Sequence, residues 1–136
     1  MNEHFTSSYK TILNSTINKC QETIDGCQIL DDKCGTGAKR ACAKQLGICS
    51  RLANECIDLC QQSIQECQDH VQTCDDQVCI AHNREAIKAA EKCVLACEKL
   101  IIACRTEQSQ CINAELTIIK SCSQCAKALY RCLQKD

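Results

Sequence analysis

The sequence predicts an all-α protein: an antiparallel, up-down-up-down four-helix bundle whose core is lined by cysteine. Three observations support this fold class. Proline is absent and glycine occurs four times in 136 residues, which leaves few turn residues for a sheet protein. Seventeen residues are cysteine, so thiols must fill core positions that Ile and Leu usually hold. Most of these cysteines are spaced by seven or four residues, which places them on one face of a helix.

The clearest pattern covers residues 37–79, where the cysteines follow each other at steps of seven, seven, four, seven, seven and five. It predicts a helix over about residues 38–74 that carries two adjacent lines of side chains. These lines are Cys42, Cys49, Cys56, Ser63 and His70 on one side, and Cys60, Cys67 and Cys74 on the other. The step of five at Asp75-Asp76 breaks the helical register, so we expect a turn over about residues 75–79.

An earlier helix is predicted over about residues 3–33, with three thiols at heptad spacing in its second half. They are Cys20, Cys27 and Cys34. Gly35-Thr36-Gly37 should end this helix, because glycine accepts the left-handed conformation common after a last helical turn. The string Gly35–Arg40 lacks the spacing and the preceding strand of a phosphate-binding loop, so a turn between helices is the better interpretation.

A third helix should start near residues 78–80, and one unbroken heptad phase then runs from Cys97 to Cys132. A single helix over 80–134 would be about 80 Å long at 1.5 Å per residue, and the two earlier helices could not cover it. We therefore expect a break near Thr106–Gln110, where the sequence turns polar, and a fourth helix over about 110–134. Residues 1–136 then form a single domain with short connections between its helices.

Composition and charge argue against several classes of function. The net charge of −1 gives no basis for binding nucleic acid or an anionic membrane, and Phe, Tyr and Trp together number three. No segment approaches the roughly 20 apolar residues of a membrane span. Residues 1–20 lack the apolar run of a secretory signal, so we expect a cytoplasmic protein with reduced thiols. Every cysteine resembles its neighbours, so no catalytic residues are predicted and we do not expect an enzyme.

Disulfides and zinc fit the cysteine pattern poorly. Cβ atoms at i and i+4 lie roughly 5–6 Å apart against about 3.8 Å in a disulfide, so only bridges between helices are feasible. Zinc sites usually contain paired Cys-x2-4-Cys units, and only Cys122 and Cys125 have a two-residue gap. Four thiolates around zinc also leave two negative charges in the core. Iron–sulfur clusters need tight cysteine runs on loops. Reduced thiols that pack as small hydrophobes would explain two or three cysteines but not seventeen.

Monovalent copper fits better, because it is soft, selects thiolate and accepts two or three ligands. One Cu(I) per thiolate leaves the core neutral, and shared thiolates give a capacity of roughly 15–20 ions per chain. His70 and His82 are candidate ligands at the entrance to the bundle, while His4 should be solvated. The candidate metal ligands are Cys20, Cys27, Cys34, Cys42, Cys49, Cys56, Cys60, Cys67, Cys74, Cys79, Cys93, Cys97, Cys104, Cys111, Cys122, Cys125, Cys132, His70 and His82.

Two segments resemble the bacterial copper storage proteins, a family of cysteine-rich four-helix bundles. They are Cys93-Val-Leu-Ala-Cys97 with Cys104, and Ser121-Cys122-Ser-Gln-Cys125-Ala-Lys with Arg131-Cys132. The resemblance implies a core filled with Cu(I) held by pairs of cysteines. It implies the cytosolic branch of that family, assembly as a tetramer, and a copper chaperone or copper enzyme as a partner.

The leading hypothesis is therefore a cytosolic protein that stores and sequesters many Cu(I) ions. Two alternatives remain: a broader detoxification protein for soft metals such as Zn, Cd or Ag, and a helical interaction protein stapled by disulfides.

Overall fold

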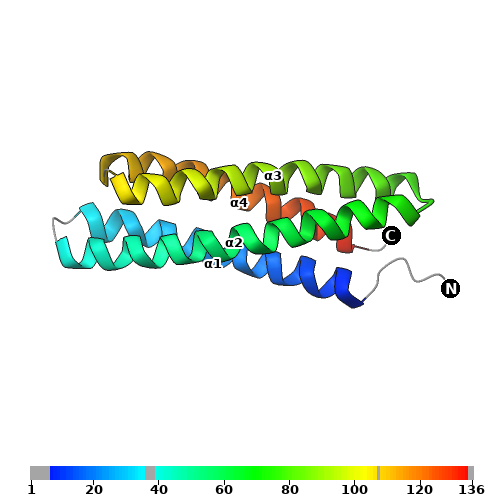
Figure 1. Cartoon of the computed structure of the whole chain (residues 1–136), viewed down its shortest axis with the longest axis horizontal. Helices are drawn as coiled ribbons and strands as arrows, with labels where there is room; N and C mark the ends of the chain where they lie inside the picture. Colours follow the sequence, from blue (N-terminus) through cyan, green and yellow to red (C-terminus); the bar gives the residue numbers. More distant parts are fainter. Residues whose placement is uncertain (1–6, 36–38, 107, 135–136) are drawn as a thin grey trace.

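The computed structural model describes residues 7–35, 39–106 and 108–134, and almost all of them are helical. The helices are α1 (Ser7–Gly35), α2 (Lys39–Thr73), α3 (Gln77–Thr106) and α4 (Gln108–Leu133). They lie side by side along one long axis (Figure 1). The predicted all-α four-helix bundle is confirmed, and the described ranges contain no strand.

Each helix packs against two neighbours. Helix α1 contacts α2 and α4, and helix α3 contacts the same two. The end of α1, the start of α2, the end of α3 and the start of α4 all lie at one end of the bundle (Figure 1). The turn between α2 and α3 lies at the other end, together with the start of α1 and the end of α4. Side chains from all four helices therefore meet along one central axis.

The helix boundaries agree with the predicted ones to within a few residues. The predicted break near Thr106–Gln110 is present, since α3 ends at Thr106 and α4 begins at Gln108. The turn between α2 and α3 is shorter than predicted, because Asp76 caps α3. Its Oδ1 accepts hydrogen bonds from the backbone N–H groups of Val78 at 2.9 Å and Cys79 at 3.3 Å. This is the usual way of satisfying the free N–H groups of a first helical turn.

Thiols and aliphatic side chains share the core. The fully buried aliphatic residues are Leu13, Leu30, Leu100, Ile118 and Leu129, each 0% exposed. Burial of each such side chain stabilises the fold by about 1.5–3 kcal/mol. The buried cysteines with free thiols are Cys20, Cys27, Cys49, Cys56, Cys60, Cys67, Cys93, Cys97, Cys122, Cys125 and Cys132. Cysteine thus takes core positions that a bundle normally gives to aliphatic residues.

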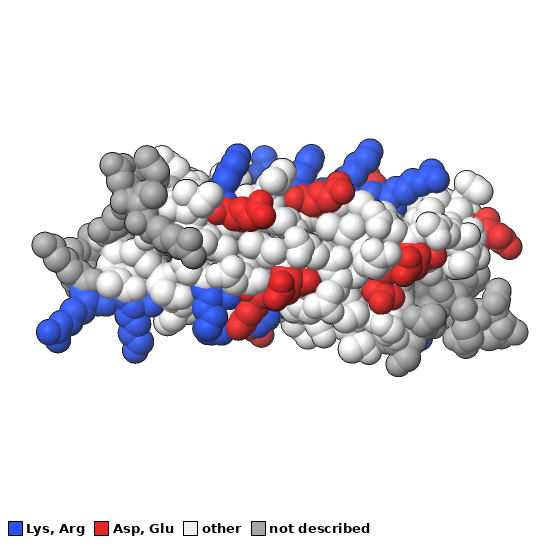
Figure 2. Space-filling view, viewed as in Figure 1, with Lys and Arg blue, Asp and Glu red and all other residues white. Residues whose placement is uncertain are grey.

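The surface carries charges of both signs. On the face in Figure 2, Lys and Arg side chains project mainly from the two long edges, and Asp and Glu lie between them. Within the described ranges, no helix combines the length and apolar character that crossing a membrane requires.

Candidate metal centre

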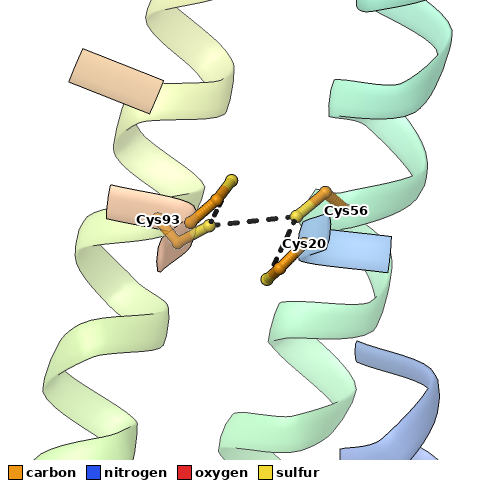
Figure 3. A group of neighbouring side chains, drawn as sticks. Cys20, Cys56 and Cys93 are labelled. Carbon is orange, nitrogen blue, oxygen red and sulfur yellow. Dashed lines mark hydrogen bonds between the residues drawn. The ribbon is translucent and has the colours of Figure 1, made fainter. Parts of the chain in front are cut away.

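Four cysteines, one from each helix, converge at the middle of the bundle. The Sγ atom of Cys56 lies 3.9 Å from that of Cys20 and 3.8 Å from that of Cys93. Cys93 Sγ in turn lies 3.4 Å from Cys122 Sγ. Figure 3 shows Cys20, Cys56 and Cys93 pointing toward one another from three different helices. The four sulfur atoms all lie within 4.8 Å of one another, and all four residues are buried.

A second set of four thiols overlaps the first. It comprises Cys20, Cys60, Cys93 and Cys125, whose sulfur atoms also lie within 4.8 Å of one another. Cys20 and Cys93 belong to both sets. The two sets differ on α2, where Cys56 and Cys60 are 3.9 Å apart, and on α4. Metal ions in both sets would therefore have to share two sulfur ligands.

Cys97 completes what we call the central group, because it lies one helical turn after Cys93 on α3 and is 0% exposed. The central group is defined as Cys20, Cys56, Cys60, Cys93, Cys97, Cys122 and Cys125, each of which is 0% exposed. The heptad spacing on each helix is what brings these side chains to one level of the bundle. The prediction that thiols from separate helices face one another is confirmed for this group.

Hydrogen bonds within the central group shift the thiol pKa values in opposite directions. Hydrogen bonding with Cys122 and Cys125 lowers the pKa of the Cys93 thiol. Hydrogen bonding with Cys125 and Cys20 raises the pKa of the Cys60 thiol, and bonding with Cys122 raises that of Cys20. Hydrogen bonding with Cys122 and Cys20 lowers the pKa of the Cys56 thiol too, so the thiols of this group titrate together. Any further thiolate in this dry core needs a cation.

The histidine end of the bundle holds a separate group, formed by His70, Cys74 and Cys79. Their ligand atoms lie within 4.8 Å of one another, and His70 Nε2 is 3.1 Å from Cys79 Sγ. Cys74 and Cys79 are half-buried. Desolvation and hydrogen bonding with Cys74 raise the pKa of the Cys79 thiol to about 12. We expected the turn after α2 to bring together His70, Cys74, Cys79 and His82, and the structure brings together the first three.

Two residues that the sequence analysis did not predict position His70. The ring of Tyr9 stacks on the imidazole with the ring centroids 4.7 Å apart, and the Tyr9 hydroxyl donates to Asn83 Oδ1 at 2.7 Å. Asn83 Nδ2 donates to the Cys79 carbonyl at 2.8 Å. Asn83 lies two heptads before Cys97, on a thiol line, whereas Tyr9 does not lie on one, so the cysteine spacing gave no signal for Tyr9.

His82, the other predicted histidine ligand, is not a member of this group. Its backbone carbonyl accepts a hydrogen bond from the Cys132 thiol at 3.3 Å. Cys132 is also hydrogen-bonded to Cys67, and this bond raises the pKa of the Cys67 thiol. His4, which was expected to be solvated, lies outside the described residues.

Thiols share the stretch between the central group and the histidine end with other side chains. Cys67 and Cys132, one heptad after Cys60 and Cys125, are buried free thiols here. The Thr16 and Ser63 hydroxyls are 2.7 Å apart, and both residues are fully buried. Leu13 and Leu129, one heptad from Cys20 and Cys122, are also fully buried, so the core at this level is only partly lined by sulfur.

At the opposite end, Cys34 and Cys42 are joined in a disulfide. Both were predicted as metal ligands, and in this oxidised form they have no thiolate to offer. The connection between α1 and α2 is short, so it brings the last turn of one helix beside the first turn of the next. The bridge joins two helices, the only kind that helix geometry allows. The side chain of Cys111, another predicted ligand, is outside the described residues.

The sequence analysis also missed Glu115, which is 2% exposed and lies in the core of α4. Its position one heptad before Cys122 was the available signal. Charge on Glu115 acts on the pKa values of both Cys27 and Cys49, so the carboxylate lies in the vicinity of these thiols.

Fold and site together define a cysteine-rich helical bundle with clustered thiols that are suited to holding metal ions. Comparison with known proteins finds no matching family model, no matching curated protein and no matching solved structure.

Proposed function

We propose that this protein stores and sequesters Cu(I) on the thiols of its core, with the central group as the main site. The observation that supports this most strongly is the pair of overlapping thiol sets that share Cys20 and Cys93. Shared sulfurs suit an ion whose thiolates bridge two metal centres, and Cu(I) is soft enough to favour all-sulfur coordination with two or three ligands. One Cu(I) per thiolate also leaves no net charge in a core that excludes water.

Zinc is the alternative metal that a specific observation supports. A tetrahedron of thiolates at a Zn–S distance of about 2.3 Å has edges of about 3.8 Å. The observed Sγ–Sγ distances of 3.9, 3.8 and 3.4 Å around Cys56 and Cys93 are near this value. Zinc in such a site would leave two uncompensated negative charges among fully buried groups, and a second zinc could not bind without sharing ligands. A store for copper therefore has the stronger physical basis.

The resemblance to the bacterial copper storage proteins supports the same choice of metal. From it we also take the remaining features of the proposal: a cytoplasmic location, a tetramer, and copper exchange with a chaperone or a copper enzyme. Storage requires no turnover, and we propose that the protein is not an enzyme.

The test is an anaerobic titration of the fully reduced protein with Cu(I) in competition with a chromophoric Cu(I) chelator. We expect roughly 15–20 ions per chain, the capacity of thiolates that each bridge two ions. An endpoint below about five ions per chain would contradict storage. A parallel titration with Zn(II) tests the alternative: displacement of bound Zn(II) by stoichiometric Cu(I) supports copper, and resistance to displacement supports zinc.

A further inference from the structure

The turn between α2 and α3 carries a set of ligand atoms whose chemistry differs from that of the central group. The ligand atoms of His70, Cys74 and Cys79 lie within 4.8 Å of one another. They supply one imidazole nitrogen and two sulfur atoms, whereas the central group supplies sulfur alone. All three residues belong to one short segment of the chain, so this set depends on a single turn and not on the convergence of four helices.

Backbone hydrogen bonds hold this turn in shape. The Cys74 N–H donates to the His70 carbonyl at 3.0 Å, which extends the helical hydrogen-bond pattern of α2 to Cys74. On the other side of the turn, Asp76 Oδ1 accepts a hydrogen bond from the Cys79 N–H at 3.3 Å, and the Asp76 carbonyl accepts one from the Ile80 N–H at 2.9 Å. The backbone of all three ligand residues is therefore positioned before any ion binds.

Two buried residues support the ligand side chains. The Tyr9 ring stacks on the His70 imidazole with the ring centroids 4.7 Å apart, and the Tyr9 hydroxyl donates to Asn83 Oδ1 at 2.7 Å. Asn83 Nδ2 donates to the Cys79 carbonyl at 2.8 Å and to Cys79 Sγ at 3.6 Å. Asn83 is 0% exposed and Tyr9 is 2% exposed. Hydrogen-bonding groups in such positions orient the ligands of a metal ion and tune their basicity.

The ligand set and its geometry suit a tetrahedral ion. Zn–N and Zn–S distances of about 2.0 and 2.3 Å place two such ligand atoms about 3.6 Å apart in a tetrahedron. His70 Nε2 and Cys79 Sγ are 3.1 Å apart, so a small outward movement of these side chains admits the ion. Two cysteines and one histidine are an established set for zinc sites that keep a fourth position open. Cys74 and Cys79 are half-buried, so water can reach that position.

The charge of the set also favours a divalent ion. Two thiolates and a neutral imidazole carry two negative charges, which one divalent ion cancels, whereas one Cu(I) leaves one of them uncompensated. Asp75 and Asp76 in the same turn are exposed and add further negative charge. Imidazole nitrogen is a harder ligand than thiolate, so its presence weakens the preference for Cu(I) that an all-sulfur set has.

We propose that His70, Cys74 and Cys79 form a site for one divalent cation of the zinc type, with a fourth coordination position open to water or a small anion. This site goes beyond the proposed function and does not depend on copper storage. Cu(I) that enters past the same side chains would compete with the divalent ion, but either proposal can fail without the other.

The test uses Co(II), whose absorption reports coordination number and thiolate ligation, on the anaerobic full-length chain with the Cys34–Cys42 disulfide intact. Background binding at the centre is reduced by Cys20→Ser and Cys93→Ser, which remove the two thiols common to both central sets. Any Co(II) that the remaining central thiols hold should not respond to a change at His70. In this background we expect a tetrahedral Co(II) with thiolate charge-transfer bands, displaced by Zn(II).

Two histidine variants form the matched comparison. His70→Ala removes the nitrogen ligand and should weaken Co(II) binding by about 100-fold or more, since even groups outside the coordination sphere are worth 10–100-fold. His82→Ala removes an imidazole of α3 that is not a member of the group, and it should leave the Co(II) affinity unchanged. Helical circular dichroism shows that each variant is folded. Cys79→Ser should weaken binding by a similar factor, which keeps the test decisive if His70→Ala does not fold.

Azide tests the open position. It should bind at the fourth position of the Co(II) ion and change the d–d absorption of the background chain, and the change should be absent from His70→Ala. The proposal is overturned if His70→Ala and His82→Ala bind Co(II) alike, if Cys79→Ser does not weaken binding, or if azide leaves the Co(II) spectrum unchanged.

Discussion

The central group and the histidine end of the bundle are both rich in ligand atoms, but they differ in how those atoms are held. Seven central thiols come from all four helices and are 0% exposed. At the histidine end, His70 lies in α2, Cys74 in the turn that follows it and Cys79 in α3, and the two thiols are half-buried. If the protein stores Cu(I) as we propose, the centre retains ions in a dry, all-sulfur environment. The histidine end then exchanges ions with solvent, since imidazole binds copper reversibly and its proton competes.

This difference predicts that equal chemical changes at the two places have unequal effects on capacity. Replacing Cys20 and Cys93 with serine removes the thiols that both central sets share, so the loss should exceed the two ligands deleted. We expect the Cu(I) endpoint to fall by more than about two ions per chain. The measurement is the anaerobic titration against a Cu(I) chelator.

The matched control for that experiment changes two thiols at the histidine end, Cys74→Ser and Cys79→Ser. Its endpoint should fall by about two ions at most, because neither thiol belongs to a shared set. Equal losses in the two double variants would show that the central thiols bind ions independently and that sharing is not the basis of capacity.

The same difference separates capacity from rate at His70. His70→Ala should slow Cu(I) loading and leave the final endpoint nearly unchanged, because imidazole passes the ion inward and does not store it. Stopped-flow mixing with a Cu(I) chelator complex gives the rate, and the titration gives the endpoint. Tyr9→Phe is a useful comparison, since it retains the ring that stacks on His70 but removes the hydroxyl bonded to Asn83. A large fall in endpoint for His70→Ala would make His70 a storage ligand.

Thiol ionisation should also limit the stability of the reduced, metal-free protein. Burial raises the pKa of Cys79 from 9.0 to about 12, and hydrogen bonding and burial raise those of Cys60 and Cys67. A raised pKa in the folded state contributes stability that is fully present below the unfolded pKa near 9.0 and lost as pH rises toward the folded value. We expect the unfolding midpoint in urea to be lower at about pH 11 than at about pH 8. Loading with Cu(I) should reduce this dependence, because metal-bound thiolates no longer titrate.

The smallest expected effect concerns Gly47, which lies inside α2 away from both metal groups. No heavy atom lies within 4 Å of a Cβ placed on it, so alanine fits without strain. Gly47→Ala should stabilise the apoprotein by up to about 1 kcal/mol and leave the Cu(I) endpoint unchanged. Urea unfolding measures the change in stability, and the titration measures the Cu(I) endpoint. If Gly47→Ala destabilised the protein, the surface of α2 at Gly47 would have to be packed against other groups.

Heptad spacing was sufficient to predict the four helices, their approximate bounds and the convergence of the central thiols. Helix bounds follow from local signals, such as the step of five residues at Asp75-Asp76 and the polar stretch after Thr106. The layers of the core do not follow from local signals. The level of a residue along the bundle axis depends on where each of the antiparallel helices ends. That is why Ser63, which lies on a thiol line, proved to be a hydrogen-bond partner of Thr16.

Three other features could not be predicted from the cysteine spacing alone. The disulfide between Cys34 and Cys42 depends on how closely α1 and α2 approach at their connected ends. Glu115 is charged, as surface residues usually are, but its heptad position is that of a core residue. Only its burial in the structure shows that it lies in the core. Tyr9 stacks on His70 at the histidine end, because α1 begins at the same end of the bundle as the turn between α2 and α3 (Figure 1).

X-ray absorption at the copper edge of the Cu(I)-loaded protein tests most directly whether ions share thiolates at the centre. We predict a first shell of sulfur atoms only and a short copper–copper vector, which bridging through Cys20 and Cys93 requires. Isolated copper ions without copper neighbours, or a first shell dominated by nitrogen and oxygen, would contradict storage in a shared thiolate core.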